Sequence, residues 1–222
     1  PRRTRPRPVV LSAQRRHALL EWAAAGDRLV IEDDYDAEFR YDRQPVGSLQ
    51  GLDPHRVMSI GSVSKSLAPS MRLGWMLCPP ALTEAVAAEK QLMDRGSPAL
   101  DQLALARLME SGRFDRHLRR MRGIYATRRS ALDAALAEHA PAVPISGLSA
   151  GFFHVMAMLP PGSSETAVIA EAAERSVGLQ GLDRYRLSAT EPAAIVLGFG
   201  DLSENAIWEG ISRIASLLGP PS

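Results

Sequence analysis

Three short apolar runs constrain the fold of this chain more than any other feature of its 222 residues. They cover residues 29–31, 57–60 and 73–78, and polar or turn-forming residues bound each of them. Runs of this length are typical of buried strands, whereas a buried helix needs about ten residues or more. A helical stretch stands before the first run. Strands that alternate with helices in this way predict an α/β sheet with both faces covered.

Helices are expected where apolar residues keep helical spacing over longer stretches. These stretches are residues 12–25, 81–94, 98–110 and 113–139. On the first helix Ser12 is the expected N-cap, and Leu19, Leu20 and Trp22 form the expected inner face. Later in the chain the elements become short and mixed, with strands expected at 152–158 and 193–199 and helices at 165–176 and 203–218. This change predicts a small α+β domain after the long helix.

Composition excludes several classes of protein. Apolar residues make up 45% and charged residues 23% of the chain, as in ordinary globular proteins. No apolar run reaches the roughly 20 residues of a membrane helix, and the Arg-rich start lacks the apolar core of a signal peptide. The single cysteine, Cys78, fits a reducing compartment, so a cytoplasmic protein is expected. Beyond the four arginines of the first eight residues, 25 acidic residues outnumber 22 basic ones, which argues against nucleic-acid binding by this chain itself.

The distribution of lysine is the first pointer to chemistry. Only two of the 26 basic residues are lysines, Lys65 and Lys90. Lys90 stands in a helical stretch, where a solvated surface position is expected. Lys65 stands between Ser64 and Ser66, soon after a predicted strand, which is an unusual place for a charge that serves solubility alone. An amine in such a place can form a Schiff base with an aldehyde.

The aldehyde cofactor pyridoxal 5'-phosphate needs a lysine, a cationic and hydroxyl-rich site for its phosphate, and an acid beside its pyridine nitrogen. Arg72 follows Lys65 by seven residues, and its planar guanidinium suits bidentate contact with phosphate. Asp33 follows the first predicted strand, where open α/β sheets bind ligands. The further candidates are Ser62, Ser64 and Tyr35, as donors to the phosphate and to the phenolic oxygen. The alternative is that Asp33 caps a helix or is solvated and that Arg72 forms a surface ion pair.

Four stretches of the sequence resemble the aminotransferase-like domain of MocR-type transcriptional regulators, which belong to the GntR superfamily. They are residues 30–41, 61–74, 117–122 and 197–199. These regulators fuse a winged-helix DNA-binding domain to a fold-type-I domain that binds pyridoxal phosphate. The resemblance implies that Lys65 is the Schiff-base lysine and that Asp33 is the partner of the pyridine nitrogen. It also implies that Tyr35 contacts the phenolic oxygen and that Ser62 and Arg72 hold the phosphate.

The resemblance implies a fold and partners as well. The expected fold class is α/β, with the latter half of a fold-type-I large domain followed by a small C-terminal α+β domain. The expected parts are an irregular basic tail at residues 1–9, a partial cofactor-binding domain at 10–112, a linking helix at 113–140 and the small domain at 141–222. The complete protein is expected to be a homodimer that binds a small-molecule effector or amino-acid-like ligand and reaches DNA only through a winged helix. Neither a metal nor a membrane is expected as a partner.

Two departures from the family pattern leave alternatives open. A winged helix and the first half of the large domain are expected before this sequence and are not in it. Val196 stands where active aminotransferases carry the arginine for the substrate carboxylate, and Arg186, a possible substitute, is expected on the surface. The leading hypothesis is therefore an effector-sensing, cofactor-binding domain. The alternatives are a fragment of a catalytic class I/II aminotransferase and a truncated remnant with no intact site.

Overall fold

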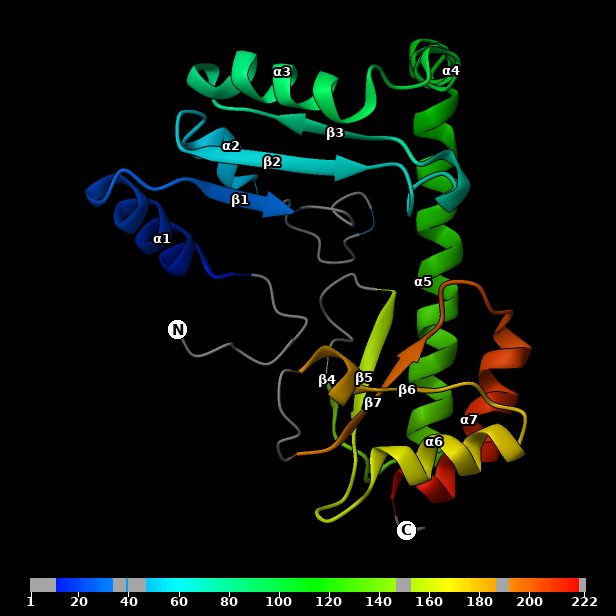
Figure 1. The fold of residues 1–222 in the computed structure, drawn as a ribbon. Coiled ribbons are helices and arrows are strands. Elements are labelled where there is room, and N and C mark those ends of the chain that lie inside the picture. Colours follow the sequence, from blue (N-terminus) through cyan, green and yellow to red (C-terminus); the bar gives the residue numbers. More distant parts are fainter. Residues whose placement is uncertain (1–10, 34–38, 40–46, 147–152, 187–191, 220–222) are drawn as a thin grey trace. The chain divides into compact units, whose positions relative to one another are not determined.

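A computed structural model describes residues 11–33, 39, 47–146, 153–186 and 192–219 of the chain (Figure 1). The chain forms two compact units, an N-terminal unit within residues 10–121 and a C-terminal unit within residues 122–222. The boundary falls inside the longest helix, α5 (Arg113–His139). Within the described residues, no helix combines the length and the apolar character that crossing a bilayer requires.

The N-terminal unit is built on a sheet with the strand order β1-β2-β3 within the described residues. Its elements are α1 (Ala13–Ala25), β1 (Val30–Asp33), α2 (Leu49–Leu52), β2 (Val57–Ser62), the 3-10 helix η2 (Pro69–Met71), β3 (Gly74–Leu77), the 3-10 helix η3 (Pro80–Leu82), α3 (Thr83–Asp94) and α4 (Ala99–Glu110). Strands β1 and β2 run parallel, and β3 runs antiparallel to β2. The three predicted strands and the expected helices of this unit are therefore present, and the α/β fold class is confirmed.

Helix α1 begins as expected, and two of its three predicted inner residues, Leu19 and Leu20, are half-buried. The Ser12 hydroxyl accepts a hydrogen bond from the Arg15 amide at 3.3 Å, as an N-cap does. The expectation that Trp22 faces inward is wrong, because this side chain is 53% exposed and lies beside the Arg28 guanidinium, 4.4 Å from its ring centroid. The buried residues of α1 are instead Arg16 and Ala23. The small side chain of Ala23 on the inner face lets α1 pack closely, and the large indole ring of Trp22 remains exposed.

The expectation that both faces of the sheet are covered is wrong for the described residues. Ile31 and Met76 lie on one face of the sheet and are exposed. Trp75 and Leu77 lie on the other face and are exposed as well. The described helices therefore leave parts of both faces of β1 and β3 uncovered, although the apolar residues of these strands are continuous in sequence.

The C-terminal unit holds a separate sheet with the order β4-β5-β7-β6 within the described residues. Its elements after α5 are β4 (Ile145–Ser146), β5 (His154–Met158), α6 (Glu165–Glu174), β6 (Gln180–Gly181), the 3-10 helix η4 (Leu182–Tyr185), β7 (Ala194–Gly198) and α7 (Glu204–Leu218). All three pairings in this sheet are antiparallel. The change of pattern along the sequence thus corresponds to a second sheet, and the short strands β4 and β6 escaped prediction.

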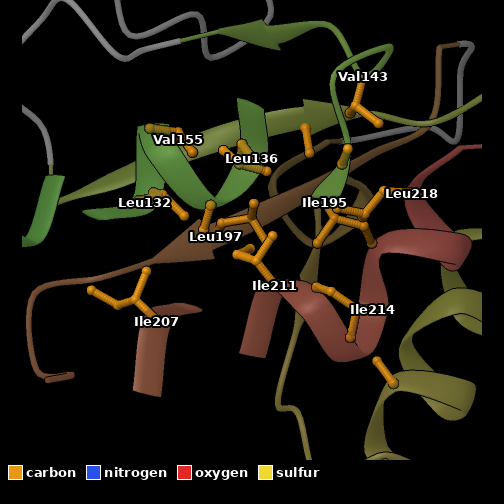
Figure 2. Packing of buried hydrophobic residues seen from close by; sticks show 14 of the residues in the cluster. Leu132, Leu136, Val143, Val155, Ile195, Leu197, Ile207, Ile211, Ile214 and Leu218 are labelled. Carbon is orange, nitrogen blue, oxygen red and sulfur yellow. The ribbon is translucent and has the colours of Figure 1, made fainter. Parts of the chain in front are cut away.

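One apolar core unites the C-terminal unit (Figure 2). Ile195 of β7, Ile214 of α7 and Leu136 of α5 are each almost completely buried in it. The core residues of α7 recur at helical spacing, at Ile207, Ile211, Ile214 and Leu218. This spacing gives α7 one continuous apolar side, which packs in the core.

A buried carboxylate joins three elements of this unit. Glu165, the first residue of α6, is buried, and its two carboxylate oxygens accept hydrogen bonds from the backbone amides of Asp183 and Ala194, each at 2.8 Å. Glu165 therefore joins α6 to η4 and β7, and it satisfies the buried Ala194 amide, which would otherwise have no partner. Gly181 lies so close to this carboxylate that a Cβ at position 181 would collide with the Glu165 Oε2 atom.

Two glycine substitutions should have opposite effects on stability. Gly210 lies in the middle of α7 beside an apolar cavity of about 70 Å³, and a Cβ there would meet no atom within 4 Å. We expect Gly210→Ala to raise the free energy of unfolding by about 1 kcal/mol, since alanine has the higher helix propensity. We expect Gly181→Ala to lower it, because the new methyl group displaces Glu165. Urea unfolding measures both changes, and destabilisation by Gly210→Ala would contradict the packing described here.

Candidate functional site

The parallel pairing of β1 with β2 brings the ends of two distant segments to one edge of the sheet. In this register Asp33 is opposite Ile60, two residues before Ser62 at the end of β2. Side chains alternate along a strand, so Asp33, Ile60 and Ser62 share one face of the sheet. The antiparallel strand β3 starts at the same edge, where Gly74 is opposite Ser62. Arg72 stands just before that strand, so the chain before and after the Lys65 turn returns to this edge.

Two neighbouring acids at the end of β1 have different surroundings. The Glu32 carboxylate accepts hydrogen bonds from the amides of Leu49 and Gln50, at 2.8 and 3.1 Å, and so caps the start of α2. Asp33 lies on the opposite face and is exposed, and its carboxylate makes no hydrogen bond or ion pair with any described residue. Of the two acids Glu32 is the one that caps α2, and the exposed Asp33 carboxylate agrees both with the cofactor hypothesis and with the alternative of a solvated acid.

Lys65 stands on a tight turn whose neighbours are buried. The amides of Leu67 and Ala68 both donate to the Val63 carbonyl, at 2.8 and 3.2 Å. Val63 is fully buried and Ser66 is 1% exposed, whereas Lys65 between them is exposed. Among the described residues the Lys65 ammonium has no hydrogen-bonding or ion-pair partner. The turn is thus anchored by its neighbours and presents an available amine.

Two serines and an arginine stand close to Lys65 in the sequence. Ser62 and Ser64 are half-buried, and Arg72 is exposed. Arg72 has φ 51° and ψ 28°, a left-handed conformation that costs a residue with a side chain roughly 1–2 kcal/mol. Strained backbone of this kind is more common at ligand-binding positions than elsewhere. Asp27, Arg95 and Ser176 also have positive φ, so the strain by itself does not mark Arg72 as a ligand-binding residue.

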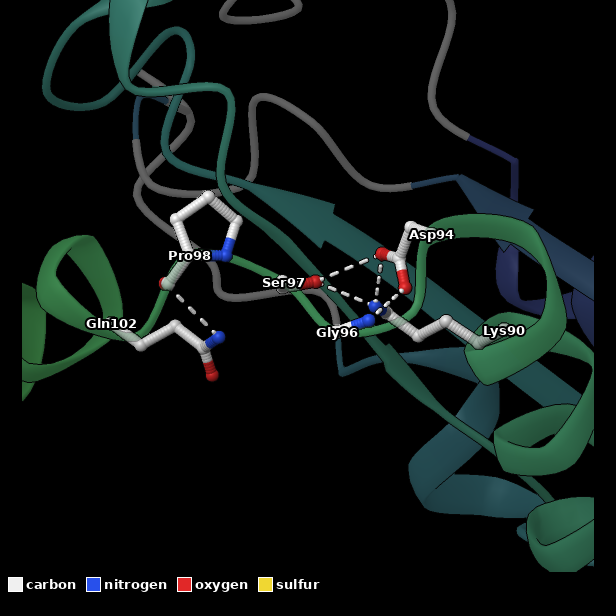
Figure 3. Close-up of polar contacts among 6 residues, drawn as sticks. All are labelled: Lys90, Asp94, Gly96, Ser97, Pro98 and Gln102. Atoms are coloured by element: carbon white, nitrogen blue, oxygen red, sulfur yellow. Dashed lines mark hydrogen bonds and ion pairs between the residues drawn. The ribbon is translucent and has the colours of Figure 1, made fainter.

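The second lysine, Lys90, is exposed like Lys65 but is engaged in polar contacts (Figure 3). The Lys90 ammonium lies 2.6 Å from the Asp94 carboxylate and 2.5 Å from the Ser97 hydroxyl. The same carboxylate accepts from the Gly96 amide at 3.0 Å. These contacts, that of Lys90 first, lower the pKa of Asp94 below its ordinary value. Lys90 thus joins the end of α3 to the start of α4 and is engaged, as its expected surface role suggests.

The C-terminal unit contributes two of the predicted positions. Val196 is half-buried in β7, between Met156 of β5 and Gln180 of β6. The expectation of a surface role for Arg186 is wrong, because its side chain is only 7% exposed. One nitrogen of its guanidinium donates to the Pro192 carbonyl at 2.7 Å, and another lies 3.2 Å from the Asp183 carboxylate. Arg186 is therefore engaged in local structure.

Sequence analysis missed one contact at the lysine turn. His117 of α5 has its Nε2 atom 2.8 Å from the Ser66 carbonyl, across 51 residues of sequence. The only signal in the sequence was the resemblance of residues 117–122 to the family, which carries no role for the histidine. Tyr35, the candidate for the phenolic oxygen, lies outside the described residues. Within the described residues no group of three or more His, Cys, Asp or Glu side chains is arranged to hold a metal ion.

Comparison with known proteins identifies similar sequences and structures. The family described as aminotransferase class I and II matches residues 7–185. The uncharacterized HTH-type transcriptional regulator YhdI of Bacillus subtilis is 39% identical over 97% of this chain and 46% of its own length. The probable rhizopine catabolism regulatory protein MocR of Rhizobium meliloti is 30% identical over 95% of this chain and 43% of its own. The chain spans about half the length of the curated relatives it matches.

The similarity extends to solved structures. The kynurenine aminotransferase of Pyrococcus horikoshii, solved with PMP, kynurenine and its product, has a TM-score of 0.88 and 29% identity. The match covers 96% of this chain and 53% of the chain of the kynurenine aminotransferase. The fold-type-I architecture is thus confirmed, as is the resemblance to the aminotransferase-like part of MocR-type regulators.

Relief of the strain at Arg72 should stabilise the chain. We expect Arg72→Gly to raise the free energy of unfolding by up to about 1 kcal/mol, because glycine adopts positive φ without steric cost but loses more entropy on folding. Arg95, which ends α3 with φ 53°, is a matched control, and Arg95→Gly should give a similar gain. Urea unfolding of both variants tests this. A loss of stability in Arg72→Gly alone would show that the Arg72 side chain, and not its backbone, dominates the balance.

Proposed function

We propose, because this chain belongs to the aminotransferase class I and II family, that it binds pyridoxal 5'-phosphate at Lys65 and senses an effector. The observation that supports the proposal most is the register of the sheet, which puts Asp33 at the end where β2 leads into the Lys65 turn and where the chain returns through Arg72 to β3. The family match and the regulator relatives support the class of cofactor and the regulatory role. The DNA-binding activity of the complete regulator, and its cytoplasmic location, are part of the same proposal.

The side chains at this edge fit that cofactor. Lys65 offers an exposed amine, through which the aldehyde would be held as a Schiff base. Arg72 and the Ser62 and Ser64 hydroxyls supply a cation and donors for phosphate oxygens. Asp33 supplies an accessible carboxylate, which keeps a neighbouring pyridine nitrogen protonated. When bound, pyridoxal phosphate supplies an electron-accepting ring.

Sensing is favoured over transamination by the C-terminal unit. Valine at position 196 offers no cation to a substrate carboxylate, and the Arg186 guanidinium already contacts the Pro192 carbonyl and Asp183. A ligand that reaches Lys65 would then be bound without the carboxylate clamp of an active aminotransferase. An amino-acid-like effector whose own amine replaced the Lys65 amine on the cofactor's aldehyde carbon would release Lys65 as a free amine. Such a change is a chemical signal that a linked DNA-binding domain can use.

We also propose that the complete protein is a homodimer that uses helices α3 and α4. Met93 at the end of α3 is 86% exposed, and Leu100 near the start of α4 is 81% exposed. Leu92 and Leu103 are exposed beside them in sequence. Large apolar side chains clustered on two consecutive helices are unfavourable in water and typical of an interface between subunits. A second copy of the chain is the partner that a family with homodimeric members implies.

Reductive trapping tests the cofactor site directly. The chain is incubated with pyridoxal phosphate, reduced with borohydride and digested, and the labelled peptides are quantified by mass spectrometry. We expect at least about fivefold more label on Lys65 than on Lys90, since one net hydrogen bond or charge contact is worth about that factor. Arg72→Gly and Asp33→Asn should each reduce the label at Lys65 severalfold.

Matched controls separate the site from general reactivity. Arg95→Gly relieves the same kind of backbone strain and should leave the ratio of Lys65 to Lys90 labelling unchanged. Equal labelling of the two lysines in the unmodified chain would show that this chain has no intact cofactor site.

Substitution of the exposed leucines tests the dimer. We expect Leu100→Glu to lower the apparent mass in solution, because a buried carboxylate without a partner disfavours association. Leu202→Glu, at an exposed position in the C-terminal unit, is the control and should leave the mass unchanged. Size-exclusion chromatography with light scattering measures both. Association that is insensitive to Leu100→Glu would place the interface elsewhere.

A further inference from the structure

We propose that His117 is a positioning residue for Lys65, because it fixes the peptide group between Ser66 and Leu67 within the lysine turn. The inference rests on the proposed function, because it gives the position of the Lys65 amine its importance. His117 does not itself need to touch the cofactor. Its role is to hold the turn in the conformation that presents the amine at the sheet edge.

One peptide group connects the lysine turn to α5. The peptide that links Ser66 to Leu67 contains the Ser66 carbonyl and the Leu67 amide. The Leu67 amide donates to the Val63 carbonyl at 2.8 Å, within the turn. The Ser66 carbonyl lies 2.8 Å from the His117 Nε2 atom, on α5. Both ends of this peptide group are therefore hydrogen-bonded, one within the turn and one to a helix far away in sequence.

The direction of the proton follows from the acceptor. A carbonyl oxygen only accepts, so the Nε2 atom of His117 carries the hydrogen and donates it. This fixes the tautomer of a neutral His117. No other described side chain forms a hydrogen bond to residues 63–68. The Ser66 hydroxyl is buried and has no partner among the described residues, so it does not replace His117.

Helix α5 gives the histidine a fixed base. Phe114, one turn before His117, and Leu118, the next residue, are both buried. His117 itself is half-buried, whereas Arg116, Arg119 and Arg120 are exposed, so His117 stands on the buried side of the helix. A donor anchored in this way transmits the position of α5 to the turn. The backbone that follows Lys65 is then held in one conformation, and the positions that the Lys65 amine can reach are restricted.

Two variants of similar length separate the hydrogen bond from the bulk of the side chain. His117→Met removes the donor, whereas His117→Gln keeps an N–H donor at a similar reach. Leu118→Ala is the stability control, since it weakens the packing of α5 and leaves the donor in place. The first readout is the native-state hydrogen exchange of the Leu67 amide. The second is the ratio of pyridoxal phosphate trapped by borohydride at Lys65 and at Lys90.

We expect His117→Met to speed exchange of the Leu67 amide about fivefold relative to the Leu118→Ala control, with the two variants compared at equal global stability. This is about the factor that one net hydrogen bond contributes. The Lys65 to Lys90 labelling ratio should fall by a similar factor, and His117→Gln should restore both values. The proposal is overturned if His117→Gln behaves like His117→Met, or if the labelling ratio is unchanged when exchange is faster. If His117→Met does not fold, a His117→Gln variant with faster Leu67 exchange than the unmodified chain overturns it as well.

The two proposals fail in different ways. Equal labelling of Lys65 and Lys90 in the unmodified chain would reject the cofactor site. The exchange of the Leu67 amide still decides in that case whether His117 fixes the turn, because this readout needs no cofactor.

Discussion

The site depends on one interaction, the parallel pairing of β1 with β2. The register Val30 to Val57 brings Asp33 level with Ile60 and so to the edge from which the Lys65 turn leaves the sheet. Backbone hydrogen bonds along this pair set the distance between two segments that are about thirty residues apart in sequence. A shift of one residue would turn Asp33 to the face that Glu32 now occupies, where the acid caps α2. The different roles of the two acids, Glu32 as a helix cap and Asp33 as an accessible carboxylate, therefore follow from the register of β1 with β2.

Much of this fold could be predicted because local rules agree with tertiary structure. Ser12 and Ser203 each cap the helix that follows, with hydroxyls that accept from amides three residues on. The bounds of α5 were predictable because apolar positions recur at helical spacing over its whole length. Of the candidate site, Asp33, Lys65 and Arg72 could be named because they follow or precede short apolar strands. That they form one cofactor site stays a prediction.

Other features depend on contacts that no local pattern carries. Trp22 was expected inside, but the small side chain of Ala23 fills the inner face of α1, and an apolar residue is not buried unless the packing leaves room for it. The burial of Arg186 depends on acceptors at Pro192 and Asp183, which only folding brings near. The tie between His117 and Ser66 crosses 51 residues, and either residue alone is unremarkable in sequence. Contacts of this kind are visible only in three dimensions.

A crystal structure of the chain with pyridoxal phosphate would test the central claim most directly, which is that Asp33 and Lys65 act on one ligand. The account predicts electron density continuous from the Lys65 amine to the cofactor, with the pyridine nitrogen within hydrogen-bonding distance, about 3 Å, of the Asp33 carboxylate. It also predicts phosphate oxygens beside Arg72. A cofactor bound away from Lys65, or a Lys65 amine and an Asp33 carboxylate on opposite faces of the sheet, would contradict it.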